Sequence, residues 1–164
     1  MRPEDAFSRA RSGGPPVAAM SLRHWSVSHA AALARFYTRF EAVLKTLCPL
    51  FARLGWARAE RPVAAVERLV KTVLFDCRMC GKCVLSSTGM ACPMNCPKAL
   101  RNGPCGGVRA DGNCEVHPAM PCVWVKAWEG AQAMGDDLST RNGPIDHRRA
   151  GASSWLQVSR DAAS

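Results

Sequence analysis

The sequence lacks the short motifs that mark a self-contained catalytic site. It has no G-x-G-x-x-G, no G-x-x-x-x-G-K-[ST] phosphate loop, no H-E-x-x-H and no G-x-S-x-G nucleophile elbow. The cysteine-rich stretch carries only two carboxylates, Asp111 and Glu115, so a general acid–base pair has no support there. We therefore expect no independent catalytic centre in this chain.

Long apolar runs are also missing. No stretch approaches the roughly 20 apolar residues that a membrane-spanning helix needs. The first 25 residues include Glu4, Asp5 and a Gly-Gly-Pro-Pro break, and they lack the apolar core of a signal peptide. We expect a soluble, cytoplasmic protein without membrane contact, in which clustered thiols are metal ligands rather than disulfides.

Aromatic residues are few, and Tyr37 is the only tyrosine. The chain is basic, with 22 Lys and Arg against 13 Asp and Glu, a formal net charge of +9. These cations are dispersed, and no aromatic residues interleave with them as a stacking platform for bases. This pattern favours solvated helix faces over a nucleic-acid-binding surface.

Periodicity divides the chain into four parts. We expect a disordered leader over residues 1–22, a helical hairpin over 23–75, a cysteine-rich metal-binding module over 76–134 and a polar C-terminal tail over 135–164. The fold class is mainly α, with an N-terminal helical hairpin followed by an irregular, loop-rich region that metal stabilises. Residues 77–122 show no sustained helix or strand period, so a conventional core does not account for their folding.

Two apolar stripes define the expected hairpin. We interpret both as core, with the two helices packed antiparallel; the alternative is an exposed stripe that awaits a partner. Pro49 should kink or split the first helix, Gly55 should end it, and Pro62 should begin the second. The stripes comprise Leu33, Phe36, Phe40, Val43, Leu47, Leu50 and Leu54, followed by Val63, Val66, Leu69, Val70, Val73 and Leu74.

Three features lie outside the cysteine-rich stretch. We expect Cys48 to be a buried free thiol on the first helix. The stretch "VWVKAWEGAQAM" predicts one short helix ending at Gly135, with Trp124 and Trp128 on the apolar shell of the metal region. Near the end, Trp155 and Leu156 are interpreted as a clasp onto the body of the chain.

The chain has nine cysteines, which is a high number for 164 residues, and eight of them lie between residues 77 and 122. The opening triplet C-x2-C-x2-C is typical of iron–sulfur proteins, in which a later Cys-Pro supplies a further ligand. Both Cys92 and Cys96 precede proline. We expect the triplet to group with one of these two, leaving four thiols for a second centre. The eight candidate ligands are Cys77, Cys80, Cys83, Cys92, Cys96, Cys105, Cys114 and Cys122.

Zinc is the main alternative to iron–sulfur clusters. Structural zinc sites commonly use two separate C-x2-C pairs, whereas here the two C-x2-C steps share Cys80. Eight thiols still suffice for two zinc sites. On spacing we favour two 4Fe-4S clusters, with zinc as the alternative and disulfides last. Lys82, Lys98, Arg101 and Arg109 would offset the negative charge of thiolate-bound clusters, or they are ordinary surface charge.

Residues 75–125 resemble a known cysteine-rich domain, the C-terminal domain of methylenetetrahydrofolate reductase. The most distinctive pieces are "CGKCVLSSTG", "CPMNCPK", "LRNGPCGG" and "CVWV". The resemblance implies one-carbon (folate) metabolism beside a reductase flavoprotein that carries FMN or FAD, and it implies that the eight cysteines are ligands. This sequence lacks the reductase barrel. We therefore expect a non-catalytic iron–sulfur subunit that exchanges electrons with a partner flavoprotein or braces its docking surface. The rivals are a zinc-stabilised adaptor, a nucleic-acid-binding zinc module and a redox or iron sensor.

Overall fold

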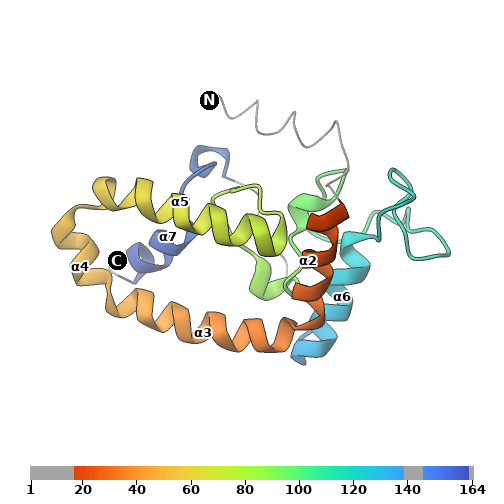
Figure 1. The fold of residues 1–164 in the computed structure, drawn as a ribbon, viewed down its shortest axis with the longest axis horizontal. Helices are drawn as coiled ribbons and strands as arrows, with labels where there is room; N and C mark the ends of the chain where they lie inside the picture. Colours follow the sequence, from red (N-terminus) through yellow and green to blue (C-terminus); the bar gives the residue numbers. More distant parts are fainter. Residues whose placement is uncertain (1–16, 139–145, 163–164) are drawn as a thin grey trace.

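Helices make up nearly all of the regular structure (Figure 1). The computed structural model describes residues 17–138 and 146–162. These contain no β-strand, only isolated bridges between Val108 and Cys114 and between Asn113 and Pro121. The expectation of a mainly α fold is confirmed. The α-helices are α2 (Val17–Ser28), α3 (Ala30–Thr46), α4 (Cys48–Leu54), α5 (Trp56–Phe75), α6 (Val123–Met134) and α7 (Ser154–Asp161).

Proline and glycine break the first helical segment where the sequence predicts. Helix α3 ends at Thr46, and α4 follows with Pro49 in its first turn. Gly55, at φ 86°, separates α4 from α5. The expected start of the next helix at Pro62 is wrong, because α5 begins at Trp56 and holds Pro62 inside. The proline removes only the bond to the Arg58 carbonyl, so the helix continues through it.

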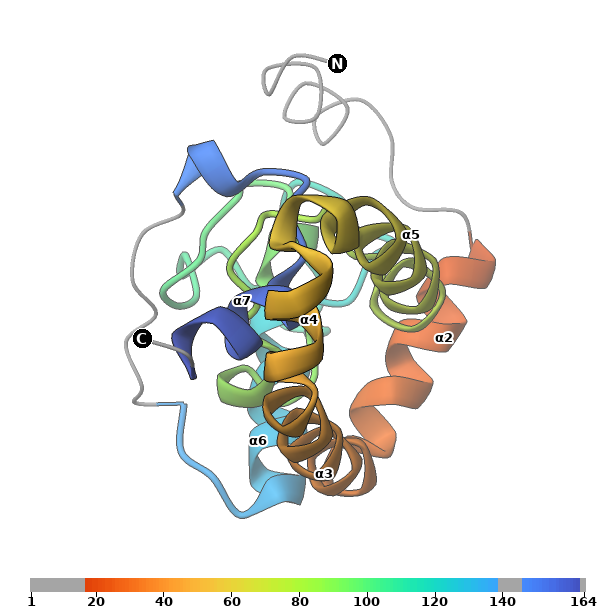
Figure 2. The ribbon, with the colours of Figure 1, turned by 90° about the vertical axis from the view of Figure 1, so that its left-hand side faces the viewer.

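Helix α7 fills the space between α3 and α5 (Figures 1 and 2). It packs against both of them, whereas α3 and α5 make few contacts with each other. We expected the two helices of the hairpin to pack directly on each other. Instead, the C-terminal helix α7 lies between α3 and α5. Leu156 is fully buried, and the Ser159 hydroxyl donates to the Leu44 carbonyl at 2.9 Å. The predicted clasp of Trp155 and Leu156 onto the chain is confirmed.

Most of the two apolar stripes lies on the surface rather than in the core. The interpretation as core is wrong for Phe36, Val43, Leu47, Leu50, Leu54, Val66, Leu69, Val70 and Val73, all of which are exposed. The helices pack through other faces instead. Helix α3 buries Ala30 and Leu44, and α5 buries Glu67, Lys71 and Phe75. The periodicity identified which side of each helix is apolar, but it did not identify the side that packs against the other helices.

Helices α2 and α6 lie beside each other at the end of the molecule opposite α4 (Figure 1). Helix α2 begins at Val17, so the expected leader over residues 1–22 is wrong for 17–22; residues 1–16 lie outside the described residues. Helix α6 ends at Gly135, at φ 73°, as predicted. Trp124 on it is buried, but Trp128 is 57% exposed and does not join an apolar shell.

Between α5 and α6 the chain is irregular, as expected, with only the short 3-10 turns η1 (Leu85–Ser87) and η2 (Pro93–Asn95). Gly89 follows η1 and contacts α6 at Gly130. A Cβ on either glycine would overlap the backbone of the other segment. This close approach of two main chains holds the loop against α6.

Among the residues that the structure describes, no helix is both long enough and apolar enough to cross a membrane. Part of the predicted polar tail is also ordered. Residues 146–162 contain the 3-10 turn η3 (His147–Arg149) and helix α7, while residues 139–145 and 163–164 lie outside the described residues.

The clasp by α7 yields a stability prediction. Leu156→Ala should lower the free energy of unfolding by about 2–5 kcal/mol, because it leaves a cavity where the side chain is fully buried. Leu69→Ala is the matched control, since Leu69 is 68% exposed and its truncation should cost under about 1 kcal/mol. Denaturant unfolding followed by circular dichroism measures both. Equal losses in the two variants would contradict the packing of α7.

Candidate metal centre

Four of the predicted ligand thiols line one cavity. Cys77 follows α5, Cys80 and Cys83 lie in the next loop, and Cys92 precedes η2. The structure thus groups the C-x2-C-x2-C triplet with Cys92, while Cys96 does not line this cavity. Lys71 on α5, Lys82 and Arg101 line it as well. The cavity therefore combines soft thiol donors with three cationic residues.

Sharp turns place these thiols on the cavity wall. Asp76, Met79 and Gly81 adopt positive φ values of 50°, 48° and 77°. At Gly81 a side chain is excluded, because a Cβ there would overlap the Arg149 carbonyl group. The Gly151 N–H also donates to the Met79 carbonyl at 2.8 Å. The segment after η3 therefore fixes the cysteine loop from outside.

Backbone N–H groups point at several cysteine sulfurs. The Met79 N–H donates to Cys77 Sγ at 3.3 Å, and the Gly107 N–H donates to Cys105 Sγ at 3.3 Å. In each pair the donor lies two residues after the cysteine. Such bonds favour the thiolate over the thiol, and they tune the reduction potential when the sulfur binds a metal.

Arg101 is a buried cation that contacts a candidate ligand. It is only 7% exposed, and its Nη1 donates to Cys80 Sγ at 3.6 Å. Its Nη2 donates to the Lys82 carbonyl at 2.7 Å. The expectation that Arg101 offsets thiolate charge fits this position. Lys98 pairs with Glu115 and also contacts the Cys105 thiol, and Lys82 lines the thiol-lined cavity. Arg109 pairs with Asp111.

A second cation reaches the cavity from a buried ion pair on α5. Lys71 Nζ lies 2.7 Å from Glu67 Oε1, and both residues are nearly fully buried. The hydroxyls of Ser153 and Ser154 donate to the Glu67 carboxylate at 2.6 and 2.5 Å. Burial works to lower the pKa of Lys71, but the charges of Cys83 and Glu67 outweigh it and raise the pKa. Lys71 is therefore a fixed positive charge beside the thiols.

Burial favours the protonated form of two of the cavity thiols, Cys77 and Cys92. It raises the pKa of Cys77 to about 11, opposed by the Met79 N–H and reinforced by Cys83 and Cys80. Burial also raises the pKa of Cys92, and nearby Cys77 acts in the same direction. A bound cation reverses this balance, because metal coordination deprotonates a thiol.

The other four predicted ligands are not gathered. Cys105 is exposed, Cys114 packs with Met120 and Val123, and Cys122 lies in a different cluster with Trp124. Across the described residues, no three His, Cys, Asp or Glu side chains converge closely enough to hold a single metal ion. All nine cysteines are free thiols. We expected Cys48 to be buried, but it is only half-buried on α4.

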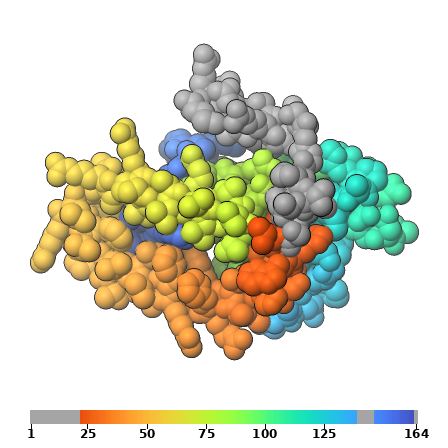
Figure 3. Space-filling model, in the orientation of Figure 1, coloured from red at the N-terminus to blue at the C-terminus, as the bar shows by residue number. Residues whose placement is uncertain are grey.

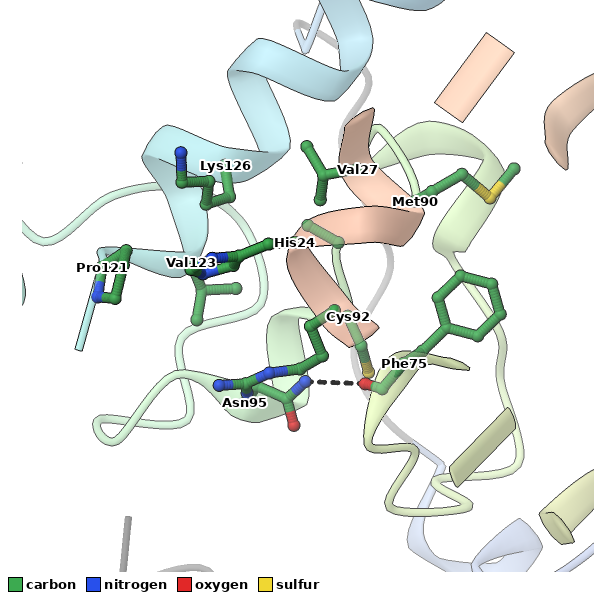
Figure 4. Close-up of a pocket in the computed structure, with 11 residues that line it drawn as sticks. His24, Val27, Phe75, Met90, Cys92, Asn95, Pro121, Val123 and Lys126 are labelled. Carbon is green, nitrogen blue, oxygen red and sulfur yellow. Dashed lines mark hydrogen bonds between the residues drawn. The ribbon is translucent and has the colours of Figure 1, made fainter. Parts of the chain in front are cut away.

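A second pocket lies on the other side of Cys92, between α2 and α6 (Figure 4). His24 and Val27 come from α2, and Val123 and Lys126 come from α6. Cys92 lines both this pocket and the thiol-lined cavity. The Asn95 amide donates to the Phe75 carbonyl at 2.8 Å, which ties η2 to the end of α5. Cys92 therefore separates the cavity from a surface pocket.

Sequence reasoning missed Glu67 and Lys71. On a helix, Glu and Lys four residues apart indicate an exposed pair, and nothing in the spacing predicts burial. The only available signal was the Ser-Ser pair before Trp155, whose hydroxyls are suited to a buried carboxylate. Burial of Glu67 depends on α7, which lies more than 80 residues away.

Burial predicts the order in which the thiols react. In protein treated with a chelator, iodoacetamide at about pH 8 should modify exposed Cys105 first and Cys77 and Cys92 far more slowly. Raising the pH to about 10 should speed modification of Cys77 about 100-fold, because its thiolate fraction rises while its pKa of about 11 stays above the pH. Peptide mass spectrometry gives the rates. Equal rates at Cys77 and Cys105 would contradict the burial.

Comparison with known proteins identifies the family. A family model described as methylene-tetrahydrofolate reductase C terminal matches residues 56–148. Searches of curated proteins and of solved structures found no match. The matched stretch runs from α5 through all eight clustered cysteines to η3, and it covers more than half of the chain. The chain therefore belongs to the family of methylene-tetrahydrofolate reductase C-terminal domains, as its motifs predicted.

Proposed function

We propose that this chain is a cytoplasmic, non-catalytic iron–sulfur subunit of a methylenetetrahydrofolate reductase system in one-carbon metabolism. It would serve a partner flavoprotein that carries FMN or FAD, by exchanging electrons with it or by bracing its docking surface. The observation that carries the proposal is the single cavity lined by Cys77, Cys80, Cys83 and Cys92. The family match connects that cavity to the reductase.

The donor set fits a 4Fe-4S cluster. Each thiolate of such a cluster binds a different iron, so the four sulfurs surround a space instead of meeting at one ion. Thiols that line a cavity without converging on a point agree with that requirement. When bound, the cluster would supply one-electron chemistry. Lys71 and Arg101 would offset its negative charge, and the Met79 N–H would bond to a ligand sulfur.

The other four cysteines fit a second centre less well. Cys96, Cys105, Cys114 and Cys122 are assigned to a second 4Fe-4S cluster by the resemblance and by their number. They differ in burial, since Cys105 is exposed whereas Cys114 and Cys122 are buried, and none of the four lines the thiol-lined cavity. The second cluster therefore needs a test of its own, which the iron and sulfide content per chain provides.

Metal and sulfide analysis of anaerobically purified protein tests the proposal. Two clusters predict about eight iron and eight sulfide per chain, with broad visible absorption that bleaches on reduction by dithionite. One cluster predicts about half of those values and would remove the second centre. A colourless protein with about two zinc and no sulfide, even after anaerobic reconstitution, would replace the electron-transfer role with that of a zinc-stabilised adaptor.

Single substitutions assign the ligands. Cys92→Ala should lose about half of the iron of a two-cluster protein, because it removes one ligand of the cavity centre. Cys48→Ala is the matched control, since Cys48 lies on α4 outside the cysteine-rich stretch, and it should retain all of the iron. Iron analysis and visible absorption of the two variants give the comparison. Equal iron contents would show that Cys92 is not a ligand.

A further inference from the structure

Nine large apolar side chains are exposed on the helices α3 to α5 and at the junction of α3 and α4. We call this set the α3–α5 face and define it by Phe36, Val43, Leu47, Leu50, Leu54, Val66, Leu69, Val70 and Val73. Phe36 and Leu69 are 66% and 68% exposed. Single exposed apolar residues are ordinary, but nine on three consecutive helices are unusual in a protein without a partner.

Helical geometry gathers these side chains into stripes. Phe36 and Val43 on α3 and Leu47 directly after its end are seven and four residues apart, which at helical spacing places them on one side. On α5, Leu69, Val70 and Val73 follow Val66 by three, four and seven residues, so these four side chains also share one side. Other sides of these helices are already occupied by α2, α4, α6 and α7. Figure 3 shows α3, α4 and α5 forming one side of the molecule.

The charge around the α3–α5 face is positive. Residues 30–75 contain eight Lys and Arg and only three carboxylates. Each carboxylate has a cation of the chain as its partner. Glu41 pairs with Lys45, Glu60 with Arg160, and Glu67 with Lys71. The arginines that remain exposed on these helices are Arg35, Arg39, Arg53, Arg58, Arg61 and Arg68.

This combination selects the kind of partner. An apolar surface bordered by unbalanced arginines is complementary to an apolar surface bordered by Asp and Glu. A second copy of this chain would present the same positive border, so self-association through the face is opposed by repulsion. The α5 part of the face also lies within the stretch that matches the reductase family, which favours a protein partner over a lipid surface.

We propose that the α3–α5 face is the docking surface for the flavoprotein subunit, through an apolar patch on that subunit bordered by carboxylates. This inference rests on the proposed function for the identity of the partner. It adds the surface that makes the contact and the chemistry that the partner must offer. Docking would be separate from the cysteine ligands, because no residue of the face lines the thiol-lined cavity.

The experiment measures binding of the purified, full-length chain to the reductase flavoprotein by isothermal titration calorimetry. Leu69→Glu and Phe36→Glu should each weaken binding about tenfold or more, because each puts a carboxylate into an apolar contact that faces acidic groups. Trp128→Glu is the matched control. It makes the same kind of change at a 57% exposed side chain on α6, outside the face, and should leave the affinity unchanged.

Folding and metal content are checked independently. All three variants should keep the wild-type helical signal and iron content, since the substituted side chains are exposed and none of them lines the thiol-lined cavity. Binding of the unchanged protein should weaken as salt rises, because the arginine border contributes. Binding that does not respond to salt would contradict the acidic border of the partner.

The outcomes separate this inference from the proposed function. If the wild-type chain binds the flavoprotein and the α3 and α5 variants bind equally well, the docking surface is wrong and the accessory role stands. If the wild-type chain does not bind, the proposed partner is wrong, and the inference fails with it. Two further results overturn the inference alone. One is Leu69-dependent binding to anionic phosphatidylserine vesicles, and the other is a Leu69-dependent dimer, each with flavoprotein binding unaffected by Leu69→Glu.

Discussion

The buried pair of Glu67 and Lys71 is the constraint on which the rest of the structure depends. Two buried charges are costly to desolvate. They are tolerated only when other hydrogen bonds satisfy the donor and acceptor atoms that the ion pair does not use. Here Ser153 and Ser154 satisfy the carboxylate, and they lie at the N-cap and first position of the helix that fills the space between α3 and α5. The pair is therefore buried only where the C-terminal segment packs against α5. The same packing holds the Lys71 ammonium group at the wall of the thiol-lined cavity.

The irregular cysteine-rich stretch is held by main-chain contacts in place of a core of its own. Gly81 packs on the Arg149 carbonyl, Gly89 meets Gly130 of α6, and the Asn95 amide binds the Phe75 carbonyl. These contacts tie the first half of the stretch to three different elements. Two of the cysteines held in this way, Cys83 and Cys92, pack against a hydrophobic cluster that includes Phe75 and Met90, and both also line the cavity.

The sequence predicted features that depend on one or two residues and missed those that depend on tertiary contacts. Breaks at Pro49, Gly55 and Gly135 follow from local backbone chemistry, and all three occur. The grouping of the cysteine triplet with one Cys-Pro cysteine as ligands stays a prediction from spacing; the structure shows that Cys92, and not Cys96, lines the same cavity as the triplet. An apolar stripe in the sequence indicates that one side of a helix is apolar. It does not indicate whether another part of the protein covers that side. The structure accordingly exposes Leu69 and Val73, which we had placed in the core, and buries Glu67, which looks like a surface residue in the sequence.

The net charge of +9 divides into two populations with different physical consequences. Arg101 and Lys71 are buried beside thiols, where low dielectric makes each charge strong and where cations lower the cost of holding several thiolates together. The arginines of α3 to α5 are exposed, so salt screens them and they act mainly on association with other molecules. A single basic protein can in this way stabilise anionic sulfur internally and select an acidic partner externally. The two roles need no shared residue, which leaves the docking surface and the cysteine cavity open to separate test by substitution.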